Sequence, residues 1–132
     1  MKALKPDNVT FIQGDSFTLE KSLSSQFLSK LPHPWVIIED AHANTRGVLE
    51  YFHDFTVEGD YIVVEDTNPD IPKKAGMGCT TDKCEVLGTL KLECLKSFLR
   101  DYEEYYAVDS FINDLFGYNG TWHTNGFIRR MK

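Results

Sequence analysis

Two pairs of acidic residues each follow a short apolar run, and carboxylates placed in this way can bind a metal ion. Glu39-Asp40 follows the run WVII, and Glu65-Asp66 follows the run YIVV. If the two runs are neighbouring strands, about 4.8 Å apart, then Asp40, Glu65 and Asp66 can reach one cation. Three oxygen ligands without a nearby sulfur ligand favour Mg²⁺, Mn²⁺ or Ca²⁺. In the alternative interpretation, each acid only caps a helix or a loop.

A histidine lies close to the first acidic pair. His42 stands two residues past Asp40, in the sequence DAHANT. Because an imidazole titrates near neutral pH, His42 can act as a general base or can orient a cofactor. Its alternative role is a hydrogen bond at the start of the helix that follows.

The chain between these motifs alternates between strand and helix patterns. Strands are predicted at 9–13, 35–39 and 61–65, where β-branched and aromatic residues gather before turn residues or acids. The first of these strands ends in the turn Gly14-Asp15-Ser16. Apolar residues at helical spacing predict three helices, which lie at about 17–34, from 44 or 45 to about 55, and at 85–102.

The remaining segments complete an α/β pattern. Residues 67–84 form a long loop that is a candidate lid, and strands at 105–108 and 126–130 predict a C-terminal antiparallel hairpin. Alternating strands and helices predict a mainly parallel sheet with right-handed crossovers. Because ligands of such sheets bind at the carboxyl ends of the strands, we expect the turn at 14–16 and both acidic pairs to converge on one edge.

The composition is that of one globular, acidic domain spanning residues 1–132. The chain has a mass of 15.1 kDa and a net charge of −6. This charge has the wrong sign for binding nucleic acid or an anionic membrane surface, and no stretch approaches the roughly 18 apolar residues of a membrane span. The three cysteines are an odd number, which indicates reduced thiols and a cytoplasmic location. Cys79 and Cys84 could form half of a zinc site, but no second pair follows nearby.

Four segments together resemble a known family. VTFIQGDS, VIIEDAHANT, EGDYIVVED and the closing NGFIRR are similar to the cephalosporin hydroxylase and rhamnosyl O-methyltransferase family, whose members have the Rossmann-like class I methyltransferase fold and use S-adenosylmethionine. The resemblance covers most of the chain. It implies a divalent-metal-assisted O-methyltransferase acting on the hydroxyl of a small molecule or a sugar.

The resemblance also implies roles for individual residues. By position, the acids that bind Mg²⁺ are Asp40, Glu65 and Asp66. The turn Gly14-Asp15-Ser16 would lie beside the adenine of S-adenosylmethionine. Asp40 and His42 would also face the cofactor, with His42 near the sulfonium as the candidate catalytic residue.

The sequence departs from the pattern of this family and of the similar catechol O-methyltransferases in two ways. The catechol enzymes carry a catalytic lysine three residues after the first metal-binding acid, where this chain has Ala43. Moreover, the glycine-rich turn that holds most of the cofactor belongs to two strands that precede the segment similar to 9–13, so we expect a partial domain that lacks them. Two functions follow as alternatives: a methyltransferase whose site is completed elsewhere, or a non-catalytic remnant or interaction domain of the same fold.

An incomplete sheet predicts assembly. In the family's strand order, the two missing strands separate the strand at 9–13 from the strand at 35–39. The second strand would then have an unpaired edge and uncovered apolar faces, and such strands pair with other chains. We expect self-association; the alternative is that residues 9–13 pair directly with residues 35–39.

Overall fold

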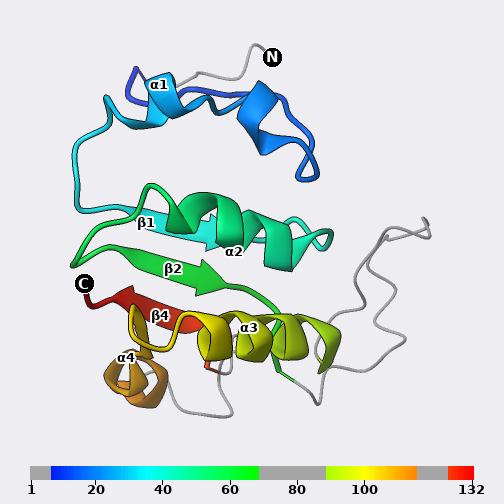
Figure 1. Ribbon diagram of the computed structural model, residues 1–132, viewed down its shortest axis with the longest axis vertical. Coiled ribbons are helices and arrows are strands. Elements are labelled where there is room, and N and C mark those ends of the chain that lie inside the picture. Colours follow the sequence, from blue (N-terminus) through cyan, green and yellow to red (C-terminus); the bar gives the residue numbers. More distant parts are fainter. Residues whose placement is uncertain (1–6, 69–88, 116–124) are drawn as a thin grey trace.

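The computed structural model describes residues 7–68, 89–115 and 125–132, and the structure reported below is that of these residues. They contain four strands, which form one sheet in the order β1-β2-β4-β3 (Figure 1). The strands are β1 (Val36–Glu39), β2 (Tyr61–Val64), β3 (Tyr106–Val108) and β4 (Phe127–Arg130).

The sheet is mixed. β1 and β2 are parallel, and β4 is antiparallel to both β2 and β3, between which it lies. Three strands therefore share one direction and β4 runs against them. The predicted α/β class and the antiparallel pairing of the last two predicted strands are confirmed. The term "mainly parallel" describes the strand directions but not the pairings, because two of the three pairings are antiparallel.

Two helices cover one face of the sheet. Figure 1 shows α2 (Thr45–His53) and α3 (Thr89–Asp101) side by side in front of the strands. Their apolar sides and the strand residues that face them form the core, in which each fully buried large side chain contributes roughly 1.5–3 kcal/mol. The core residues are Leu49, Ile62, Val64, Leu95, Phe98, Tyr106 and Ile128.

The N-terminal segment differs from its prediction. No strand forms at residues 9–13 within the described chain, and the helix predicted near 17–34 is replaced by a 3-10 helix (Leu19–Lys21) and the short α1 (Ser25–Leu28). The serines explain the break, because the hydroxyl of Ser22 donates to the carbonyl of Leu19, and the hydroxyl of Ser24 caps α1 by accepting from a backbone N–H. Local hydrogen bonds therefore outcompete one continuous helix.

The other face of β1 is open in the described part of the chain. Strand alternation directs Ile37 and Glu39 toward the helices, and it leaves Val36 and Ile38 on the far face with exposed fractions of 68% and 61%. Among the described residues β1 pairs only with β2, so residues 9–13 do not pair with it. The direct pairing that we weighed as an alternative to self-association is therefore wrong.

Two further features concern the second half of the chain. A short helix, α4 (Ser110–Leu115), lies between β3 and β4 and was not predicted. Most of the predicted lid, the start of the helix predicted from residue 85, and both Cys79 and Cys84 lie outside the described residues. Among the helices that the structure describes, none has the length and apolar character needed to cross a membrane.

Candidate metal centre

The two acidic pairs are brought to the same edge of the sheet. β1 and β2 are parallel and in register, with Glu39 opposite Val64. The next step along the chain keeps this alignment, since the backbone N–H of Glu65 donates to the carbonyl of Glu39 at 3.0 Å. Asp40 and Asp66 therefore leave neighbouring strand ends together, as the sequence predicts.

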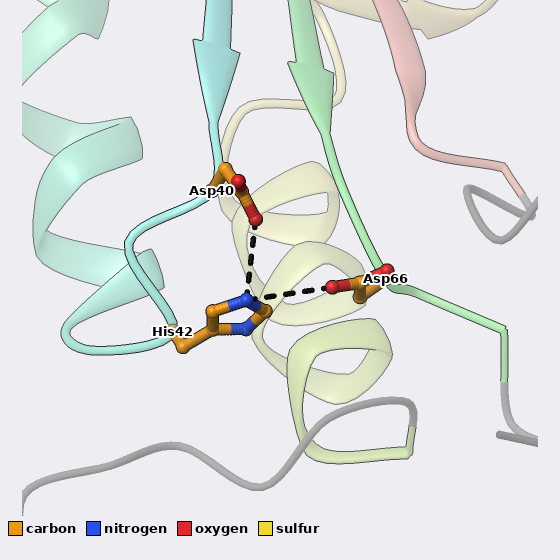
Figure 2. Close-up of side chains that lie close together, drawn as sticks. All are labelled: Asp40, His42 and Asp66. Carbon is orange, nitrogen blue, oxygen red and sulfur yellow. Dashed lines mark ion pairs between the residues drawn. The ribbon is translucent and has the colours of Figure 1, made fainter. Parts of the chain in front are cut away.

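His42 lies between these two carboxylates (Figure 2). Its Nε2 is 3.2 Å from Oδ1 of Asp40 and 3.5 Å from Oδ2 of Asp66. One donor atom from each of the three residues lies within 4.8 Å of the other two. This group forms the candidate metal centre of the protein.

Backbone conformation and burial shape this centre. His42 and Asp66 have positive φ angles, 53° and 56°, and residues other than glycine adopt this left-handed conformation at some cost in free energy. Asp66 is buried, the side chain of His42 is about one quarter exposed, and that of Asp40 is more than half exposed. The centre is therefore fixed on its inner side by Asp66 and open to solvent at Asp40.

The donor atoms fit a divalent cation. Two carboxylates give the charge and the hard oxygen ligands that Mg²⁺ or Mn²⁺ needs, and an imidazole nitrogen adds a ligand that Mn²⁺ and other transition metals accept. If Nε2 carries a proton, that proton lies between the two carboxylates. Nδ1 of His42 is buried and has no hydrogen-bond partner among the described residues, so nothing described holds the ring in one tautomer through that atom.

The position of Glu65 differs from that of the other two predicted metal ligands. Glu65 is half-buried and is not a member of the three-residue group, whose third member is His42. Its assignment as a ligand stays a prediction, as do the roles of Asp40 and Asp66. From the sequence, His42 was interpreted as a base, a cofactor contact or a hydrogen-bonding residue at the start of the next helix, but not as a metal ligand. Its DxH spacing after a strand was the available signal for a ligand.

A second residue at this edge, Glu39, was not singled out as functional. Glu39 is 2% exposed, and its side chain faces the core, where its Oε2 pairs with Nζ of Lys91 at 2.8 Å. Strand alternation was the available signal, because Glu39 lies two residues after the core-facing Ile37. An acid at such a position requires a buried partner.

The turn predicted to contact the cofactor lies beside the start of α2. The carbonyl of Ser16 accepts a hydrogen bond of 2.7 Å from Nδ2 of Asn44, which ends the loop that carries Asp40 and His42. Oδ1 of Asp15 accepts from the backbone N–H of Phe17 and closes the turn. The described structure thus brings Ser16 next to the 40–44 loop, while contact of Gly14, Asp15 or Ser16 with a cofactor stays a prediction.

A Cβ atom at Gly14 would meet the hydroxyl of Ser22 at 2.3 Å. Any larger residue at this position would force Ser22 to move, where the turn at 14–16 passes the end of the 3-10 helix.

Comparisons with known proteins show which solved structures have a similar fold. A scan against models of protein families found no match, and a search of curated proteins found none either. Among solved structures, the chain is similar to "CmcI-N160 apo-structure", with a TM-score of 0.65 and 24% identity over the whole of this chain and 47% of that one. It also matches "cmcI-D160 Mg-SAM", with a TM-score of 0.49 and 21% identity over 81% of this chain and 39% of that one.

The chain thus spans about half of the length of the first of these solved structures. This likeness to CmcI confirms an α/β methyltransferase-like fold, as the sequence resemblance implies, while the predicted strand at 9–13 is not part of it.

Proposed function

We propose that this chain is the metal-binding part of an S-adenosylmethionine-dependent, divalent-metal-assisted O-methyltransferase that acts on a hydroxyl of a small molecule or a sugar. The observation that carries the proposal is the convergence of Asp40, His42 and Asp66 at the carboxyl ends of two parallel strands. The methyltransferase-like fold supports it, because open α/β sheets bind their ligands at this edge.

Each residue of the centre has a proposed task. A bound divalent cation would lower the pKa of a substrate hydroxyl and fix the position of its oxygen. Asp40 and Asp66 supply the negative charge that holds such a cation, and the exposure of Asp40 leaves room for a substrate on that side. The third ligand is either His42 or Glu65, and the two possibilities give different results below.

The proposed cofactor contacts come from Gly14, Asp15, Ser16, Asp40 and His42. The hydrogen bond between Asn44 and the carbonyl of Ser16 supports this assignment, since it joins the turn at 14–16 to the loop at 40–44. In methyl transfer, the bond from sulfur to the methyl group breaks, a bond from the substrate oxygen to the methyl forms, and the hydroxyl proton passes to a base. If Glu65 is the third ligand, Nε2 of His42 is our candidate for that base, because it lies within 3.5 Å of both carboxylates at the edge where the substrate would bind.

Titration with Mn²⁺, followed by the electron paramagnetic resonance of the free ion, tests the proposal. We expect one bound ion per chain in the wild type and at least tenfold weaker binding in Asp66→Asn. Weakening in His42→Asn with no change in Glu65→Gln assigns the third ligand to His42, and the reverse result assigns it to Glu65. Asp54→Asn is the matched control, because Asp54 is an exposed acid at the other end of α2.

Two results would contradict the metal-binding proposal. One is a wild-type chain that binds no Mn²⁺, and the other is equal weakening in Asp66→Asn and in the control. Bound metal should also stabilise the fold, by about 2.7 kcal/mol at one hundred times the dissociation constant. For a chain of this length, that corresponds to a rise of roughly 10 °C in the melting temperature.

A second function, an interaction domain, is favoured by the open face of β1. The exposed Val36 and Ile38 lie on an edge strand whose outer side is unpaired within the described chain. We propose that this strand mediates self-association, whether or not the metal centre is active. A chain that binds no metal but associates through β1 would favour the interaction domain over the enzyme.

A further inference from the structure

A buried ion pair involves Glu39, the residue that directly precedes Asp40 of the candidate metal centre. Nζ of Lys91, from α3, is 2.8 Å from Oε2 of Glu39, the last residue of β1. Lys91 is fully buried and Glu39 is 2% exposed. Charged side chains are rarely buried so completely, and the loss of hydration often outweighs the attraction between them.

The geometry of this pair is not one that maximises stability. Nζ of Lys91 makes the ion pair but no hydrogen bond of regular geometry among the described residues. A buried ammonium that leaves hydrogens unsatisfied costs free energy. Apolar residues of similar size would often stabilise such a site as well or better, so the pair requires an explanation other than stability.

The carboxylate of Glu39 also holds both ends of the loop that carries two of the candidate ligands. Its Oε1 accepts from the backbone N–H of Ala41 at 3.0 Å, and its Oε2 accepts from the hydroxyl of Thr45 at 3.2 Å. Between these contacts lie His42 and Asn44, with φ angles of 53° and 56°. Residues other than glycine keep this conformation when surrounding contacts determine it, and Glu39 provides two such contacts.

We propose that Glu39 and Lys91 are positioning residues for the candidate metal centre. Glu39 folds the 40–44 loop so that Asp40 and His42 face Asp66. Lys91 keeps the carboxylate of Glu39 turned into the core and balances its charge. Glu39 is therefore not a ligand of the ion, and the ligands come from the residues that follow the two strands. This inference rests on the proposed function.

The experiment measures Mn²⁺ affinity and metal-free structure in the same variants. In Lys91→Met, the buried carboxylate of Glu39 loses its counter-charge, and we expect Mn²⁺ to bind at least tenfold more weakly, as is usual when a group supporting the ligands is removed. Lys96→Met is the matched control, since Lys96 lies on the same helix and makes an exposed ion pair with Glu93; its affinity should stay within twofold of the wild type.

A double variant separates positioning from folding. Glu39→Gln with Lys91→Met removes both charges but keeps a side-chain oxygen that can accept from Ala41, so we expect it to fold and to recover part of the affinity lost in Lys91→Met. If Lys91→Met alone does not fold, the double variant is compared directly with Lys91→Arg. Because Lys91→Arg keeps the buried positive charge, it should bind Mn²⁺ more tightly than the double variant. Equal affinities in these two variants would overturn the inference.

A metal-free measurement distinguishes this inference from the proposed function. The ring resonances of His42 in a nuclear magnetic resonance spectrum should shift in Lys91→Met and remain unchanged in Lys96→Met. A wild type that binds no Mn²⁺, together with a shifted His42, would refute the metal centre but leave the positioning of the loop supported. Unchanged His42 resonances, or Mn²⁺ affinity in Lys91→Met within twofold of a wild type that does bind, would overturn the positioning role itself.

Discussion

Replacement of Asp60 should destabilise the fold more than the replacement of any exposed acidic residue. Asp60 precedes β2 and is fully buried. Its Oδ1 accepts from the backbone N–H of Trp35 at 2.7 Å, and its Oδ2 accepts from that of Val57 at 2.9 Å. Oδ2 also lies 2.8 Å from Nδ1 of His33, whose ring stacks on that of Trp35. One carboxylate therefore ties the segment before β1 to the turn before β2.

The contacts set the size of the effect. In Asp60→Ala, two backbone N–H groups lose a charged acceptor, and each such loss costs about 1–3 kcal/mol. The partly exposed contact with His33 adds at most about 1 kcal/mol. We therefore expect a loss of about 2–7 kcal/mol, which is a large share of the 5–15 kcal/mol typical of a domain. Asp60→Asn keeps one oxygen acceptor and should lose roughly half as much.

Equilibrium unfolding in urea measures these free energies. Asp54→Ala is the control, because Asp54 is exposed at the end of α2, and its free energy of unfolding should stay within about 0.5 kcal/mol of the wild type. A loss below about 1 kcal/mol in Asp60→Ala would refute the reasoning. It would mean that water or other groups replace the carboxylate at no cost.

Three further predictions concern pH, assembly and cofactor. Burial, and then the charge of Arg130, lower the pKa of His53 below 6.5; Nη1 of Arg130 lies 2.7 Å from Nδ1 of His53, where it donates to the unprotonated ring. The contribution of unprotonated His53 to the free energy of unfolding is therefore fully present above pH 6.5 and is lost as the pH falls through the lowered pKa. A His53 titration midpoint at or above 6.5 in a magnetic resonance experiment would contradict this. Ile38→Lys should convert an associated species into a monomer in sedimentation, whereas a monodisperse wild type of 15 kDa would refute self-association through β1. Calorimetry of this 132-residue chain should show weak or no binding of S-adenosylmethionine, because its described strands offer no glycine-rich turn; a submicromolar affinity would prove this wrong.

The parts of the fold that could be predicted are those where the local pattern and the packing agree. β2 is a continuous apolar run between the Gly59 turn and an acidic pair, and its predicted core matches the observed Tyr61–Val64. The closeness of Asp40 and Asp66 followed from the rule that parallel strands end at one edge. Both inferences needed only properties that are local or general to α/β sheets.

The failures occur where a distant contact decides the structure. Residues 9–13 have strand-forming side chains, yet Phe11 is 77% exposed and no described strand pairs with the segment, because strand propensity alone does not supply a partner. The position of His42 depends on a left-handed backbone conformation, which a histidine in the sequence does not predict. The burial of Lys91 depends on Glu39, which is far away along the chain.

The place of β4 in the sheet has a consequence for how the protein is made. β4 is the last strand along the described chain, yet it lies between β2 and β3, and its Ile128 is fully buried in the core. During synthesis, β3 therefore leaves the ribosome before the strand that joins it to the rest of the sheet exists. The four-stranded sheet cannot be completed until translation has reached Arg130. A premature stop shortly before Phe127 would leave β2 and β3 unpaired with each other through β4, with exposed strand edges that are prone to aggregation.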